Sequence, residues 1–232
     1  MADKDIEVLK GKTNPNILLV APHGHSKDDV NTGSLARSIQ KILDCPAIIN
    51  EVFRKPKEIE KKPGEFEAPN VDKRILDLYQ KQQAEEHPRF LKAIEKKIKQ
   101  PDSTFVFWIH GIDDKNIKAE SEAQNQKDTL NCLIGHGQPD RDTCNKATAM
   151  GLLGALNSVG IRASTASEKA KNYCGWDTNR LNQHFRVSGN GFKAVQSVQL
   201  EFGFKGVRDK GSVEKTAEKF ARALVPSKFH HL

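Results

Sequence analysis

Short apolar runs alternate along the chain with segments in which apolar residues recur at helical spacing. The run at 16–21 (Asn-Ile-Leu-Leu-Val-Ala) follows a turn signal and predicts a buried strand. Apolar positions at helical spacing then cover 35–43, preceded by Asn31 or Thr32 as a capping residue. A second apolar run at 47–50 completes a strand–helix–strand unit, which predicts a parallel pair with a right-handed crossover.

The same alternation continues to the end of the sequence and predicts one α/β domain over residues 1–232. Further strands are expected at 103–109, 130–134, 161–165 and 195–202, and helices at 71–78, 88–98, 145–158 and 213–224. Residues 55–70 are rich in Lys, Glu and Pro and predict an excursion from the core. The fold class that follows is α/β, a three-layer αβα arrangement with a mostly parallel or mixed central sheet of the phosphorylase/hydrolase-like kind.

Composition indicates an ordinary globular protein, with 37% hydrophobic and 29% charged residues in 232. The net charge of +7 comes from lysines spread over several segments, as on solvated surfaces. Aromatic residues make up only 6% of the chain, which argues against a nucleic-acid partner. The positive field is suited to a small anionic substrate.

Cysteine spacing and hydropathy predict where the protein resides. The four cysteines show no CxxC spacing, and the first residues lack the apolar stretch of a signal peptide. No window approaches the roughly 20 apolar residues of a membrane helix. We therefore expect a soluble, cytoplasmic protein without a membrane partner; its oligomeric state is left open.

Two strong predicted strands each end in a His-Gly pair, at His23-Gly24 and His110-Gly111. Because strand carboxyl ends border the ligand crevice of open α/β sheets, both imidazoles are expected to face one site. The glycines are expected to allow unusual backbone angles and close approach of a ligand. A lone histidine at a strand end is usually an ordinary packed residue, but two in the same context favour a metal site.

A carboxylate ligand is available in the loop after the first histidine. Catalytic zinc takes three His or carboxylate ligands and leaves a position for water. The loop can fold back so that either Asp28 or Asp29 joins His23, and the sequence leaves both open. The alternative is that these acids only favour the N-terminus of the following helix.

Several short motifs together resemble the N-formylglutamate amidohydrolase family and the related poly-γ-glutamate hydrolases. The motifs are Ala21-Pro22-His23-Gly24, the acid-Asn-Thr segment before Leu35-Ala36, Phe107-Trp108-Ile109-His110-Gly111 and Val198-Gln199-Leu200-Glu201. The resemblance implies a zinc-carboxypeptidase-like α/β architecture and cleavage of amide bonds next to a glutamate-type carboxylate. It further implies zinc held by His23, by Asp28 or Asp29 and by His110, with Glu201 as general base or acid.

Candidate substrate anchors follow from the chemistry of arginine, whose planar fork can bind a carboxylate through two hydrogen bonds. Arg54, Arg180 and Arg208 are the candidates; Arg180 is favoured, because its loop also carries Asn179. His136 follows a short apolar run and is expected to line the same crevice. The Arg-rich segment of the formylglutamate enzymes is not clearly present, so the substrate remains open.

Together with this resemblance, these observations predict a zinc-dependent hydrolase that cleaves an amide bond in an N-acyl amino acid or a glutamyl substrate. Two alternatives belong to other classes. One is a phosphate-handling transferase on the same type of sheet, weakened by the lack of a phosphate-binding loop or dinucleotide fingerprint. The other is a non-enzymatic, metal-containing binding protein.

Overall fold

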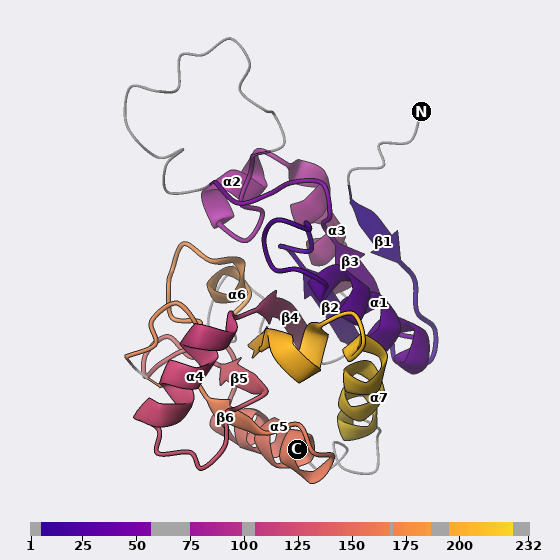
Figure 1. Cartoon of the computed structure of the whole chain (residues 1–232). Helices are drawn as coiled ribbons and strands as arrows, with labels where there is room; N and C mark the ends of the chain where they lie inside the picture. Colours follow the sequence, from indigo (N-terminus) through magenta and orange to yellow (C-terminus); the bar gives the residue numbers. More distant parts are fainter. Residues whose placement is uncertain (1–5, 57–74, 99–104, 168, 187–194, 225–232) are drawn as a thin grey trace.

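A seven-stranded mixed sheet forms the centre of the protein (Figure 1). The computed structural model describes residues 6–56, 75–98, 105–167, 169–186 and 195–224. The strands are β1 (Glu7–Leu9), β2 (Ile17–Ala21), β3 (Ala47–Ile49), β4 (Phe105–Gly111), β5 (Cys132–Gly135), β6 (Ala163–Thr165) and β7 (Gln196–Phe202). Their order across the sheet is β1-β3-β2-β4-β7-β5-β6.

Strand direction decides which loops meet at one edge of the sheet. The central strands β3, β2, β4 and β7 are parallel, so their carboxyl ends share an edge. β5 runs antiparallel to β7, and β6 runs parallel to β5. The carboxyl ends of β5 and β6 therefore point toward the opposite edge. β1 pairs antiparallel with β3 at the border of the sheet.

Helices cover both faces of the sheet, which confirms the predicted three-layer arrangement. They are α1 (Thr32–Leu43), α2 (Lys81–Glu85), α3 (Pro88–Ile98), α4 (Asp114–Ala123), α5 (Lys146–Ser158), α6 (Leu181–His184) and α7 (Val213–Leu224), with a π-helical turn, η2 (Phe204–Arg208). One face carries Leu19, Phe107 and Leu200 and packs against α1, α5 and α7. The other carries Leu18 and Trp108 and packs against α3 and α6. This division follows from the alternation of side chains along each strand.

Helix 71–78 is the predicted element that the structure contradicts. Residues 75–78 form an isolated bridge between Ile75 and Arg54 and then a turn, while 71–74 lie outside the described residues, as does most of the predicted excursion at 55–70. Tertiary contacts override the helical spacing, because the Asp77 amide donates to Gln83 Oε1 at 2.7 Å.

Helix α4 was not predicted, because only Ile117 and Ser121 are buried on it and its apolar periodicity is weak. It begins at Asp113, whose side chain accepts a hydrogen bond from the Asn116 amide at 2.8 Å. Asn31 occupies the predicted cap position of α1 in a left-handed conformation but makes no side-chain capping bond. The side-chain amide of Asn31 donates instead, through Nδ2, to the backbone carbonyl of Arg208. None of the helices in the described ranges has the length and apolarity needed to span a bilayer.

Candidate metal centre

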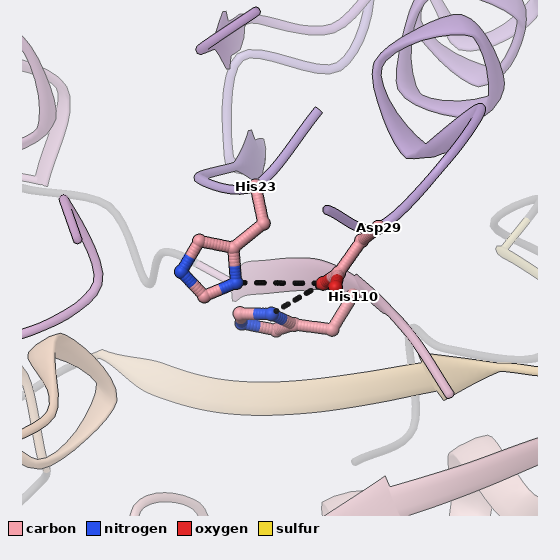
Figure 2. Close-up of side chains that lie close together, drawn as sticks. All are labelled: His23, Asp29 and His110. Carbon is pink, nitrogen blue, oxygen red and sulfur yellow. Dashed lines mark hydrogen bonds and ion pairs between the residues drawn. The ribbon is translucent and has the colours of Figure 1, made fainter. Parts of the chain in front are cut away.

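Two buried histidines and one buried aspartate converge at the carboxyl ends of β2 and β4 (Figure 2). His23 follows β2, His110 lies within β4, and Asp29 comes from the loop between β2 and α1; all three are at most 6% exposed. The Nδ1 atoms of both histidines lie 3.4 Å from the same oxygen, Asp29 Oδ2. The strand ends therefore bring together two nitrogen donors and one oxygen donor.

The loop after β2 folds back on itself, and this fold selects Asp29 over its neighbour. The Asp29 amide donates to the carbonyl of His23 at 3.1 Å. The amide of Gly111 donates to Asp29 Oδ2 at 3.1 Å and holds the carboxylate beside β4. Asp28 faces elsewhere, since its Oδ2 accepts the backbone amide of Lys55 at 2.8 Å. Asp29, and not Asp28, thus joins the two histidines.

A second carboxylate, Asp77, orients the first histidine. Its Oδ1 lies 2.7 Å from His23 Nε2, so the carboxylate places a proton on Nε2 and leaves the Nδ1 lone pair toward Asp29. Asp77 is itself held by the Tyr79 amide at 3.0 Å and by Arg180 Nη1 at 3.1 Å. A carboxylate behind a ligating histidine is the usual outer support of a metal site.

Burial and charge set the protonation states of the three groups. Burial lowers the pKa of His110 to about 4, so this imidazole is neutral near pH 7. For His23, burial and Lys55 oppose the charged form, but Asp77 and Asp29 outweigh them and raise the pKa. Burial alone would raise the pKa of Asp29, yet its bonds to His110 and His23 keep it well below the ordinary value. The carboxylate is therefore ionised.

The donor set fits a tetrahedral zinc ion. Zinc bonds of about 2.0 to 2.1 Å at tetrahedral angles separate neighbouring ligand atoms by about 3.3 Å. The two observed nitrogen–oxygen distances of 3.4 Å match this separation and are long for hydrogen bonds. Within the described residues, His23 Nδ1 is buried and makes no hydrogen bond, so it can serve as a ligand atom.

Glu201 lies next to this centre on β7 and is 4% exposed. It is the register partner of His110 on the neighbouring parallel strand, so both side chains emerge on the same face of the sheet. Burial, with a further contribution from the charge of Asp29, raises the pKa of Glu201 to about 7. A carboxyl group with this pKa can both accept and donate a proton near neutral pH.

A chain of hydrogen bonds fixes the orientation of Glu201. Gln199 Nε2 donates to Glu201 Oε1 at 2.6 Å and to the backbone carbonyl of Asn172 at 3.1 Å. Because that carbonyl can only accept, the amide nitrogen of Gln199 must face it. The amide oxygen consequently accepts the Tyr79 hydroxyl at 2.9 Å. One carboxylate oxygen of Glu201, Oε1, is therefore occupied by the Gln199 amide.

All these side chains border one cavity of about 240 Å³. Two cations also line it: Lys55, bonded to Asp29, and Arg180, held by Asp77 and Asp177. The two ion pairs of Arg180 use Nη1 and Nε, so Nη2 can donate to a ligand in the cavity. Among the predicted substrate anchors, Arg180 has the position that such a role requires.

The other predicted substrate residues do not line this cavity. Arg208 is 5% exposed, and its guanidinium donates to the backbone carbonyls of Phe202, Val30 and Ile112. Arg54 forms the bridge with Ile75, and Asn179 is exposed in the turn before α6. His136 follows β5, and because β5 is antiparallel to β7 its carboxyl end points away from Glu201.

The glycines of the two His-Gly pairs have a packing role that differs from the predicted one. Neither has a positive φ angle. A β-carbon on Gly24 would lie 2.7 Å from the carbonyl oxygen of Asn50, and one on Gly111 would lie 2.5 Å from the Arg208 guanidinium. Close approach of protein atoms, and not an unusual backbone angle, requires glycine at both positions.

Sequence reasoning gave no role to four residues of the site: Lys55, Asp77, Tyr79 and Gln199. Asp77 and Tyr79 lie in an irregular segment far from both histidines in sequence, and no local pattern marks them. Lys55 belongs to the lysines spread along the chain, and nothing in the sequence distinguishes it from those of a solvated surface. Gln199 did carry a signal, because it shares a strand face with Glu201.

Comparisons with known proteins support the architecture. No protein-family profile matches the sequence, and no curated protein does. The structure is similar to the N-formylglutamate amidohydrolase of Ralstonia eutropha JMP134, with a TM-score of 0.61 and 10% identity over 94% of this chain and 95% of that chain. A gene product of Agrobacterium tumefaciens gives 0.59 and 13% over 95% of both chains. A zinc-free, apo form of a protein named YNDL gives 0.50 and 16% over 98% of this chain and 93% of that chain. The resemblance inferred from short motifs is thus confirmed at the level of the fold.

Proposed function

We propose that this protein is a zinc-dependent hydrolase that cleaves an amide bond in an N-acyl amino acid or a glutamyl compound. The observation that carries the proposal is the grouping of His23, Asp29 and His110 beside Glu201 in one cavity. The similar fold of an N-formylglutamate amidohydrolase supports the reaction class. The similar protein YNDL is distinguished as an apo, zinc-free form, and this supports zinc as the metal.

Each group in the cavity has a role in such a reaction. His23, Asp29 and His110 would hold zinc, which when bound polarises a carbonyl oxygen and lowers the pKa of water. Glu201, with its pKa of about 7, takes a proton from the attacking water and delivers it to the leaving nitrogen. Gln199 directs this proton to Oε2, because it already occupies Oε1. Asp77 keeps Nδ1 of His23 directed toward the site.

The cavity also supports a small anionic substrate. About 240 Å³ accommodates a group of the size of one amino acid, and Arg180 offers donors to a carboxylate. We place the carboxylate of the substrate at Arg180 and the scissile amide between His110 and Glu201. An N-acyl glutamate such as N-formylglutamate has this combination of groups.

A reducing compartment is consistent with this chemistry. Cys45, Cys132, Cys144 and Cys174 are all buried and unpaired. Free thiols of this kind are typical of reducing compartments, and we propose that the protein acts in the cytoplasm.

The test combines metal analysis with a substrate panel. Purified protein should contain about one zinc per chain and should hydrolyse at least one of N-formylglutamate, N-acetylglutamate and a γ-glutamyl amide. Glu201→Gln should keep the metal and lose on the order of a hundredfold or more in turnover. Zinc with no hydrolysis of any member would favour the non-enzymatic metal-binding alternative.

A further inference from the structure

Lys55 places a positive charge directly against the candidate metal ligand Asp29. Its Nζ donates to Asp29 Oδ1 at 2.8 Å, whereas Oδ2 faces the two imidazoles and the Gly111 amide. The two oxygens of one buried carboxylate thus have different partners. The side chain of Lys55 is 37% exposed and borders the cavity.

The neighbouring acid holds the backbone of the same lysine. Asp28 Oδ2 accepts the Lys55 amide at 2.8 Å, while Asp29 accepts its ammonium group. Consecutive acids therefore fix Lys55 at two points, and this accounts for the acid pair that the sequence left unassigned. The loop after β2, which carries both acids, therefore holds Lys55 in place.

Charge compensation gives this contact a function. A buried carboxylate without a cation is costly, and Asp29 is only 6% exposed. Lys55 provides that cation in the metal-free protein. A divalent ion held by His23, Asp29 and His110 would compensate the negative charge of the same carboxylate. The ammonium group of Lys55 and the metal ion, both positive, would then repel each other.

We propose that Lys55 is the counter-ion of Asp29 in the metal-free protein, and that metal binding takes over this role and releases the ammonium into the cavity. Lys55 consequently stabilises the empty site and weakens metal binding. The released ammonium becomes available to an anionic group of the substrate. This inference rests on the metal centre proposed above.

Replacement of the lysine separates the two effects. In Lys55→Met the metal-free protein should melt at a lower temperature than wild type, because Asp29 has lost its counter-ion. The zinc dissociation constant of this variant should be on the order of tenfold smaller, since a partly solvated positive charge next to the ion is removed. Lys27→Met is the matched control, because Lys27 is an exposed lysine of the loop that carries Asp28 and Asp29 and does not border the cavity. It should change neither quantity. Lys55→Arg keeps the charge and should bind zinc as wild type does.

Release of the ammonium has a separate readout in the unmodified protein. Amine acylation followed by mass spectrometry should label Lys55 faster with zinc than without it, while the labelling of Lys27 stays the same. If Lys55→Met is too unstable, Lys55→Gln keeps a donor for Asp29, removes the charge and should also bind zinc more tightly.

The outcomes distinguish this inference from the metal centre itself. Normal zinc binding by wild type, with equal or weaker binding by both neutral variants, would overturn the role of Lys55 alone. Equal labelling of Lys55 with and without zinc would overturn the release. If wild type binds no zinc, the metal centre is wrong and this inference falls with it.

Discussion

Replacing Glu201 by glutamine should stabilise the metal-free protein, and the gain should depend on pH in a defined direction. Burial raises the pKa of this carboxyl group from 4.5 to about 7, so the folded state favours the protonated form. At about 1.36 kcal/mol per pKa unit, the difference corresponds to about 3 kcal/mol. The residue is 4% exposed, so solvent screening does not reduce this value appreciably.

The sign follows from proton linkage. The stability contributed by protonated Glu201 is fully present below pH 4.5 and is lost as pH rises through about 7. Glutamine has no proton to lose and still offers an oxygen to Gln199. The free energy of unfolding of Glu201→Gln relative to wild type should therefore rise by about 3 kcal/mol between pH 4.5 and pH 8.

Urea denaturation at a series of pH values, with a chelator present, measures this difference. Glu218→Gln, a replacement of an exposed glutamate on α7, is the control for the general effect of removing one negative charge. A difference between Glu201→Gln and wild type that does not change with pH, or that favours wild type at pH 8, would refute the reasoning. It would mean that Glu201 is not held in a desolvated site.

Three further predictions concern the groups around Glu201. His23→Ala should lose most bound zinc while His25→Ala retains it, since His23 belongs to the group around Asp29 and His25 does not; metal analysis of both proteins decides this. Asp77→Asn should weaken zinc binding by about 10- to 100-fold, because it removes the negative charge of the acceptor that orients His23, and competition with a chelator measures the change. Arg180→Ala should lower kcat/KM for a carboxylate substrate, with a loss of about 2 kcal/mol in transition-state stabilisation, and should abolish discrimination against the neutral amide analogue. This loss is at the lower end for a buried charge pair, because the Arg180 side chain is 28% exposed.

Most of the fold could be predicted from the sequence, because its strands are apolar and its main helices have strong periodicity. The predicted strands that correspond to β2, β4 and β7 are parallel neighbours, so their three carboxyl ends lie at one edge of the sheet. The antiparallel direction of β5 could not be predicted, since a short apolar run of four residues has the same pattern in either direction. This single reversal explains why His136 lies away from the site.

The site was predictable where its residues follow strands and not where they come from irregular segments. His23, His110 and Glu201 follow or lie on recognisable strands, and their convergence is a consequence of the parallel order. The choice of Asp29 over Asp28 depends on the Gly111 amide and on Lys55, which are distant in sequence. Asp77 reaches His23 across 54 positions, from a segment without periodicity. Tertiary contacts of this kind leave no local signal.

The central claim is that His23, Asp29 and His110 together bind one zinc ion, and anomalous X-ray diffraction at the zinc absorption edge tests it most directly. Crystals grown with zinc should show one strong anomalous peak within bonding distance of His23 Nδ1, Asp29 Oδ2 and a ring nitrogen of His110. The peak should disappear in the His23→Ala, His110→Ala double variant. A map without a peak between these three side chains, or with its main peak elsewhere on the protein, would contradict the account.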